Sequence, residues 1–254
     1  MLKASKMQEI VDQIVDSQIQ IVALQEIRWR GYGLLKKDKY SIYYSCNPNN
    51  TGQAGTGFII QKSAMSKILG FEPISECICK PRVKGKFYNM TLINIYAPVE
   101  DKEEEINEQF YEEVQRTQNR VPKHDVIIIM GDMNAKLGKG KGFSQVIGHH
   151  TLHNISNENG EMVANYAISN GMFLISTNFQ HKKIHFGMWT SPDHQTINQI
   201  YHVMVSKEKM RLIHDVRSKR GYNCDSDHFL VQIKIKHKLI TVNNRQTQKY
   251  RWDR

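Results

Sequence analysis

Residues 126–130, VIIIM, form the segment that most restricts how this chain can fold. Five apolar residues in succession, without alternation, are typical of a strand that is buried on both faces or of a buried piece of helix. The residues that follow, Gly-Asp-Met-Asn, bring the carboxylate of Asp132 and the amide of Asn134 with one residue between them. The chain therefore carries groups capable of chemistry directly at the end of an element that must lie in the core.

Similar apolar runs predict further strands, and apolar residues at helical spacing predict helices between them. The predicted strands cover residues 19–24, 41–46, 55–62, 87–98, 125–130, 172–177, 198–206 and 227–236. The predicted helices lie around Met7 to Val15, after Asp101 with Ile106, Phe110 and Val114 on the buried side, and from about Gly160 to a stop at Gly171. Because strands outnumber helices and alternate with them, we expect a layered α/β sandwich rather than a doubly wound parallel sheet.

The length of 254 residues is enough for one large domain with a full core. The strand pattern is lost after residue 236, so we expect one domain over residues 1–236 and a basic tail or truncated linker over 237–254. The formal net charge of +10 favours a polyanionic partner, either nucleic acid or an anionic membrane surface. Solubility alone is the simpler explanation of the same charge.

The four cysteines are too few and too irregularly placed for a disulfide framework or a zinc module, which indicates a reduced, intracellular setting, nuclear or cytoplasmic. No stretch approaches the roughly 20 apolar residues that a membrane span requires. The N-terminus lacks the apolar core of a signal peptide. We therefore expect no membrane partner.

Polar residues follow or precede four of the predicted strands: Gln25-Glu26, Tyr96, the Gly-Asp-Met-Asn segment, and residues 225–228, DSDH. Each of these alone is compatible with ordinary turn or packing chemistry. Together they bring carboxylates, an amide and an imidazole to the strand ends, where active sites usually form. Such an oxygen-rich set suits Mg²⁺ or Mn²⁺ rather than zinc, and carboxylates brought close together need a cation between them.

Five segments then occur in a characteristic order and spacing: LQEIRW, NIYAP, GDMNAKLG, WTSPD with NQI, and SDHFLV. In this order they resemble the endonuclease/exonuclease/phosphatase superfamily, which has the DNase I-like fold, over about residues 2–236. The closer likeness is to the endonuclease domain of LINE-type retrotransposons and to a host relative of that domain. The resemblance implies a four-layer α/β/β/α sandwich in which the apolar run is a central strand and Gly-Asp-x-Asn is its catalytic end.

The resemblance also implies a role for each matching residue. Glu26 would bind Mg²⁺ or Mn²⁺, and Asp132 would orient and deprotonate the attacking water. Asn134 would hydrogen-bond the phosphate or that water, and Tyr96 would donate to a phosphate oxygen. His228 would contact the scissile phosphate. A metal with donors around it is what the charge built up in phosphodiester cleavage requires, and no organic cofactor is expected.

Four more residues receive roles in the same way. Asp227 would be a second-site metal ligand or a support carboxylate. Trp189 and Thr190 would flank the DNA groove, and Arg28 would contact DNA. The expected partner is DNA, bound by a monomer without a membrane or a small-molecule cofactor.

Two departures from the family pattern bear on activity. The family begins with a strand that carries an Asn in a motif like TWNVRT, just before the helix that starts this chain. We expect that strand to be missing here, and with it one contact to the metal or the phosphate. Tyr201 stands where the family has an Asp that accepts the imidazole N–H of the catalytic His. Loss of such an orienting Asp can cost as much as about 10⁴ in rate, by analogy with a hydrolytic triad. Asp225 is a candidate for partial replacement.

Three functions follow as alternatives. The first is a Mg²⁺-dependent endonuclease that hydrolyses DNA phosphodiester bonds, retrotransposon-derived and impaired by the two departures. The second is a catalytically decayed DNA-binding remnant of the same fold. The third, a phosphatase acting on a small or lipid phosphate, is disfavoured by the basic charge and by the retrotransposon-like motifs.

Overall fold

The computed structural model describes residues 10–14, 19–49, 52–221 and 227–241. The chain forms two compact units. The first unit comprises residues 1–96, 117–131 and 237–254, and the second comprises residues 97–116 and 132–236.

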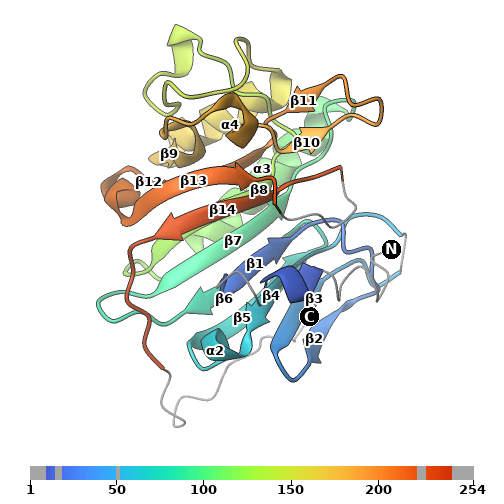
Figure 1. Cartoon of the computed structure of the whole chain (residues 1–254), viewed down its shortest axis with the longest axis vertical. Coiled ribbons are helices and arrows are strands. Elements are labelled where there is room, and N and C mark those ends of the chain that lie inside the picture. Colours follow the sequence, from blue (N-terminus) through green and yellow to red (C-terminus); the bar gives the residue numbers. More distant parts are fainter. Residues whose placement is uncertain (1–9, 15–18, 50–51, 222–226, 242–254) are drawn as a thin grey trace. The chain divides into compact units, whose positions relative to one another are not determined.

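The first unit contains an antiparallel sheet in the strand order β1-β4-β3-β2 (Figure 1). Its strands are β1 (Ile21–Leu24), β2 (Tyr32–Lys36), β3 (Tyr40–Ser45) and β4 (Thr56–Gln61), with the short helix α2 (Lys62–Met65) after β4. Large apolar side chains are fully buried on both faces of this sheet, with Tyr43 and Phe58 on one face and Ile42 on the other.

The remaining strands of the first unit run in the order β5-β6-β7-β8. They are β5 (Ile68–Ser75), β6 (Ile78–Val83), β7 (Met90–Tyr96) and β8 (Val126–Asp132), the last residue of β8 belonging to the second unit. Within the VIIIM run, Val126, Ile128 and Ile129 are buried, and Ile127 and Met130 are half-buried. The run is thus the largely buried strand that its composition predicts.

Gly131 ends this apolar run for a steric reason. Its φ of +144° is one that side-chain-bearing residues rarely adopt. A Cβ at this position would lie 1.9 Å from the carbonyl oxygen of Ile95 in β7. Only glycine therefore fits immediately before Asp132.

The second unit contains most of the helical structure and short pairs of strands. Its helices are α3 (Glu104–Asn119), which extends into the first unit, and α4 (Glu158–Ser169), with the 3₁₀ turns η1 (Lys141–Phe143), η2 (Ile175–Thr177), η3 (Lys183–His185) and η4 (Lys207–Leu212). Its strands are β9 (Met172–Leu174), β10 (Trp189–Thr190), β11 (Ile197–Asn198), β12 (Tyr201–Ser206), β13 (Ile213–Lys219) and β14 (Leu230–Ile235). β12 pairs with β9, β10 with β11, and β13 with β14, all antiparallel (Figure 1).

The expected strands are present, and several expectations need correction. Residues 175–177 form a 3₁₀ turn rather than the end of a strand. Helix α3 begins at Glu104, so Asp101 lies outside it, and Ile106, expected on the buried side, is 41% exposed. Phe110 and Val114 are buried as expected. The buried stripe of the helix thus begins at Asn107, one residue after Ile106.

The two chain ends are described in part. Residues 10–14 are helical with Val11 and Ile14 buried, as expected, whereas Met7 and Val15 lie outside the described residues. After β14, the amide of Lys86 donates to the carbonyl of Lys238 at 2.8 Å, which joins residues 237–240 to the segment before β7. The expected tail boundary at residue 236 stays a prediction, since residues 242–254 lie outside the described part. The expected loss of a preceding strand concerns sequence before Met1 and is also untested.

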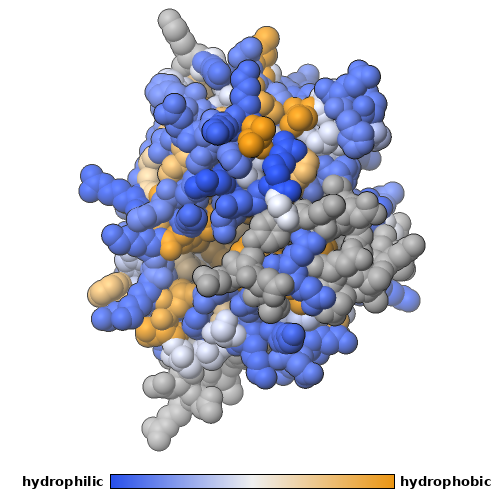
Figure 2. All heavy atoms as spheres, in the orientation of Figure 1, coloured by the Kyte–Doolittle hydropathy of each residue, from blue (hydrophilic) through white to orange (hydrophobic). Residues whose placement is uncertain are grey.

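The face of the molecule drawn in Figure 2 is mostly hydrophilic, with hydrophobic residues in small separate groups. In the part of the chain that the structure describes, every helix is too short or too polar to cross a membrane.

His202 in β12 is a buried histidine with both ring nitrogens bonded. Its Nε2 lies 2.9 Å from the carbonyl oxygen of Ala135, and its Nδ1 lies 3.1 Å from the hydroxyl of Ser176. Because a carbonyl only accepts, Nε2 carries the hydrogen and Nδ1 accepts from Ser176. Burial is the main cause that lowers the pKa of His202 to about 4.

The folded state therefore resists protonation of His202 while the unfolded state takes up the proton near pH 6.5. We expect the free energy of unfolding to fall as pH drops from about 6.5 to 4, by about 1.4 kcal/mol per pH unit. Urea unfolding at several pH values measures this slope. A His202→Gln variant should lose this contribution, whereas His214→Gln, at an exposed position, should keep the wild-type slope. Equal slopes in wild type and His202→Gln would contradict the assignment.

Candidate active site

Glu26 lies just beyond the end of β1 on a backbone of unusual conformation. Among the described residues, five other than glycine have positive φ, and three of them are predicted site residues: Glu26 (+53°), Arg28 (+57°) and Asn134 (+47°). Such left-handed conformations cost free energy and tend to be retained at functional sites. The strained backbone thus coincides with the residues that the sequence motifs select.

The turn at Glu26 is held by its neighbours in the first unit. The amides of Ile27 and Arg28 donate to the carbonyls of Gly55 and Ala54 at 3.0 and 2.9 Å. The side chain of Ile27 is fully buried. Glu26 and Arg28 flank this buried anchor.

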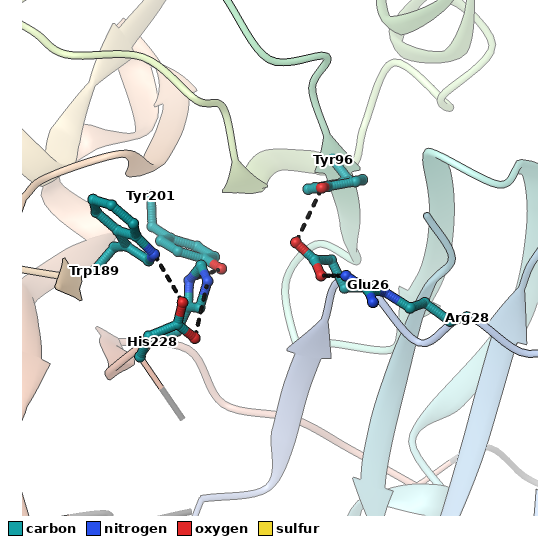
Figure 3. A network of polar contacts seen from close by, with 7 residues as sticks. Glu26, Arg28, Tyr96, Trp189, Tyr201 and His228 are labelled. Carbon is teal, nitrogen blue, oxygen red and sulfur yellow. Dashed lines mark hydrogen bonds and ion pairs between the residues drawn. The ribbon is translucent and has the colours of Figure 1, made fainter. Parts of the chain in front are cut away.

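The carboxylate of Glu26 is bound on both oxygens (Figure 3). The hydroxyl of Tyr96, the last residue of β7, donates to Oε1 at 3.0 Å. The guanidinium of Arg28 pairs with Oε2. The side chain of Glu26 remains 36% exposed. Two residues predicted for chemistry and one predicted for DNA contact therefore lie together in the first unit.

Asn94 supports this group and is absent from the residues that the sequence motifs select. Its side chain is fully buried, and its Nδ2 donates to the carbonyls of Leu24 and Gly57 at 2.8 and 3.0 Å. Its Oδ1 accepts a hydrogen bond from the amide side chain of Gln25, next to Glu26. The available signal was a single amide in the otherwise apolar run LINI.

Asp132 and Asn134 form a compact turn in the second unit. Asp132 is only 2% exposed, and its Oδ1 accepts the backbone amide of Asn134 at 3.0 Å. The side-chain amide of Asn134 donates to the carbonyl of Ala97 at 2.8 Å. The carbonyl of Asn134 accepts from the side chain of Asn159 at 3.2 Å. The aspartate and the amide are therefore fixed relative to each other.

His228 lies in a second group of the same unit (Figure 3). The hydroxyl oxygen of Tyr201 lies 2.7 Å from Nδ1 of His228, and the two rings meet edge to face at 5.5 Å. On the other side of the imidazole, Nε2 lies 3.6 Å from Oδ1 of Asp227. Tyr201 therefore still contacts the histidine that an Asp orients in the family. Asp225, the expected partial replacement, lies outside the described residues.

Asp227 is tied to the strand β10. Its Oδ2 accepts from the indole N–H of Trp189 at 3.0 Å, and its backbone carbonyl accepts from the amide of Thr190 at 2.9 Å. The two residues expected to flank DNA thus contact the residue expected to be a metal ligand or support. Its carboxylate thus lies between the indole N–H of Trp189 and Nε2 of His228.

The predicted site residues fall into two groups. Glu26, Arg28 and Tyr96 belong to the first unit, and Asp132, Asn134, Trp189, Thr190, Tyr201, Asp227 and His228 belong to the second. Each group is assembled by contacts within its own unit. The expectation that Glu26, Asp132 and His228 converge on one cation stays a prediction.

The donor chemistry fits Mg²⁺ or Mn²⁺ held loosely. Within the described ranges, His, Cys, Asp and Glu side chains do not gather in threes to form a metal cage. Mg²⁺ does not need one, because it usually keeps several waters and takes one or two carboxylates together with substrate phosphates. Glu26 suits this way of binding Mg²⁺, because its carboxylate offers hard oxygen ligands and is partly exposed. Cys46 and Cys79 do not, because burial raises the pKa of these thiols to about 11 and about 12.

Comparison with known proteins places these observations in a family. The profile of the "Endonuclease/Exonuclease/phosphatase family" matches residues 3–195. Craniofacial development protein 2 of Bos taurus is 30% identical over 224 residues, which are 88% of this chain and 37% of that protein. The same protein of Tragulus javanicus is 30% identical over 235 residues, 92% of this chain and 40% of that protein. The chain therefore spans less than half the length of these relatives.

Solved structures share the fold at low sequence identity. The endonuclease domain of TRAS1, a telomere-specific non-LTR retrotransposon, is 14% identical with a TM-score of 0.62, covering 92% of this chain and 94% of that domain. The Xenopus laevis APE2 catalytic domain is 16% identical with a TM-score of 0.68, covering 95% and 91%. The 3'-5' exonuclease NExo of Neisseria meningitidis is 15% identical with a TM-score of 0.63, covering 91% and 94%.

These likenesses confirm the α/β class and the DNase I-like fold expected from the sequence. The host relative expected alongside the retrotransposon domains is found in craniofacial development protein 2. The motifs, the fold and the match over residues 3–195 agree, and the chain belongs to the endonuclease/exonuclease/phosphatase family.

Proposed function

We propose that this chain is a divalent-metal-dependent endonuclease that hydrolyses phosphodiester bonds of DNA, derived from a retrotransposon and acting inside the cell as a monomer. The observation that carries the proposal is the carboxylate of Glu26, presented on strained backbone beside the hydroxyl of Tyr96. Family membership supports hydrolysis at phosphate in general. The likeness to a retrotransposon endonuclease domain supports the nuclease among the family's activities.

In the first unit, Glu26 would hold the Mg²⁺ ion. Bound there, the ion would supply positive charge to the phosphate oxygens as negative charge develops on them. The hydroxyl of Tyr96, which donates to Glu26 in this structure, would donate to a phosphate oxygen. Arg28, 44% exposed at its side chain, would turn from Glu26 to the DNA backbone when the ion is bound.

In the second unit, Asp132 would take the proton of the attacking water. Its burial and the amide of Asn134 fix its position, so that little reorganisation is needed at the moment of attack. Asn134 would hydrogen-bond the water or the phosphate, and His228 would donate to an oxygen of the scissile phosphate.

Asp227 serves this proposal better as a support than as a metal ligand. Its oxygens face the indole N–H of Trp189 and Nε2 of His228. These contacts hold the carboxylate between the indole and the imidazole, as a support residue would be held. As a support, Asp227 holds the histidine ring beside Trp189 and Thr190, the residues proposed to lie against DNA.

DNA suits the charge of the chain better than a small or lipid phosphate does. The net charge of +10 favours a long polyanion, whose many phosphates each add a favourable contact. Cys46 and Cys79 carry free thiols, which supports the proposed intracellular setting.

A second candidate function is a DNA-binding protein that has lost catalysis. The observation that favours it is Tyr201, which stands at the position of an Asp in the family and brings no negative charge to His228. Such a chain would keep the fold and the basic charge and would bind DNA without cutting it.

The nuclease proposal is tested by nicking of supercoiled plasmid in the presence of Mg²⁺. We expect Asp132→Ala to lower the nicking rate by about 100-fold to 10⁴-fold, because the general base is lost. Asp101→Ala, which removes an exposed carboxylate outside helix α3, is the matched control and should nick like wild type. Chelation of the metal should stop nicking. Nicking by Asp132→Ala at the wild-type rate would rule out its role as the base.

The two candidate functions are separated by DNA binding measured at several salt concentrations. We expect the affinity of both wild type and Asp132→Ala for an uncleaved oligonucleotide to fall steeply with salt, because phosphate contacts release counterions. For a nuclease, wild type nicks, and Asp132→Ala binds like wild type but nicks far more slowly. For the decayed protein, both bind and neither nicks. Affinity that does not depend on salt would contradict both.

A further inference from the structure

The imidazole of His228 is held from two sides by groups of different chemistry. Tyr201 of β12 places its hydroxyl oxygen 2.7 Å from Nδ1. Asp227 places Oδ1 3.6 Å from Nε2. All three residues belong to the second unit, so their arrangement does not depend on how the two units are placed.

These two neighbours favour one tautomer of the ring. A neutral imidazole has one N–H donor and one bare nitrogen that accepts. A carboxylate only accepts, so the charge of Asp227 favours a hydrogen on Nε2, the nitrogen that faces it. Nδ1 is then the acceptor, and a tyrosine hydroxyl is a donor that suits it. The 2.7 Å distance to Tyr201 is that of a hydrogen bond, whereas Asp227, at 3.6 Å, acts on Nε2 through its charge.

Trp189 makes the arrangement more rigid. Its indole N–H binds the second oxygen of Asp227 at 3.0 Å and so fixes the carboxylate that faces Nε2. The edge-to-face packing of the Tyr201 and His228 rings, with an interplanar angle of 87°, fixes the imidazole plane. The position of the ring and the placement of its hydrogen are thus set by the same three contacts.

We propose that Tyr201 is a positioning residue that donates its hydroxyl hydrogen to Nδ1 of His228 and thereby holds the ring with its hydrogen on Nε2. This inference rests on the proposed function in one respect: the Nε2–H group is the donor that a phosphate oxygen of DNA would meet. Tyr201 therefore orients His228 in place of the family's Asp, through a hydrogen bond in which the ring nitrogen is the acceptor.

The replacement changes the chemistry of the histidine. An aspartate at residue 201 would accept a hydrogen from Nδ1 and would favour either the opposite neutral tautomer or the doubly protonated ring. A tyrosine brings no charge to Nδ1 and, as a donor to that nitrogen, leaves the N–H on the Nε2 side.

Side-chain ¹⁵N NMR of the full chain tests the tautomer directly, without any measurement of activity. Spectra at about pH 8, above the ordinary histidine pKa of about 6.5, report the neutral ring. The chain has 11 histidines, so His228→Gln identifies the signals of His228 by their loss. Wild type should show hydrogen on Nε2 and a hydrogen-bonded acceptor at Nδ1. Hydrogen on Nδ1 would overturn the proposal.

Variants at residue 201 sharpen this test. In Tyr201→Phe the Nδ1 resonance should move downfield, toward that of an acceptor nitrogen without a hydrogen bond. In Tyr201→Asp the spectrum should change to hydrogen on Nδ1 or on both nitrogens. Tyr111→Phe is the matched control, because the buried Tyr111 hydroxyl has no hydrogen-bond partner among the described residues, and it should leave the His228 signals unchanged. An unchanged Nδ1 resonance in Tyr201→Phe would overturn the proposal.

Nicking kinetics then measure what the positioning contributes. We expect Tyr201→Phe to lower kcat by about 10- to 100-fold, the usual cost of removing a group that orients a functional histidine, with little change in KM. Circular dichroism and a melting curve show whether the variant is folded. If wild type nicks and a folded Tyr201→Phe nicks equally fast, the inference fails. If wild type does not nick at all, the proposed function fails, and the NMR spectra still decide the role of Tyr201.

Discussion

The buried amide of Asn94 is the interaction on which the Glu26 group of the first unit depends. One side chain donates to the carbonyls of Leu24 and Gly57, which lie in β1 and β4, and accepts from Gln25. A buried carbonyl without a partner costs about 1–3 kcal/mol, so a side chain that satisfies two of them is strongly favoured. The end of β1 is thereby fixed to β7. Glu26 lies just after the end of β1, and Tyr96 is the last residue of β7. Their hydrogen bond is a consequence of that connection.

The second unit uses a different principle. Its two groups of site residues are fixed by hydrogen bonds from side chains to nearby backbone or to one another, as in the Asp132 turn and the Asp227 contacts with β10. Neither group needs a rigid cluster of carboxylates, which agrees with the proposed use of a loosely held Mg²⁺. What the unit supplies is a buried carboxylate and a histidine with a defined donor side.

Much of the fold could be predicted from the sequence, because long apolar runs are strong signals, whereas the roles of the motif residues stay predictions. The run VIIIM is a largely buried strand. Three of the motif residues have a left-handed backbone, and their side chains form hydrogen bonds. Strands β2, β5, β6 and β13 were missed because glycine, proline and charged residues interrupt their pattern, as in YGLLK and ILGFEPIS. Asn94 was missed because its role depends on carbonyls distant in sequence. The contact between the Tyr201 hydroxyl and His228 was not predicted either, because it joins two residues that are 27 positions apart in the sequence.

The left-handed backbone at Glu26, Arg28 and Asn134 has a consequence for how such a chain can change over time. Each of these residues holds a conformation that glycine would adopt with less strain, at a cost of order 1 kcal/mol or more. Backbone conformation considered alone would favour glycine at all three. The chain has a carboxylate, a guanidinium and an amide there instead. Backbone strain is therefore accepted at these three positions together with side-chain groups that glycine lacks.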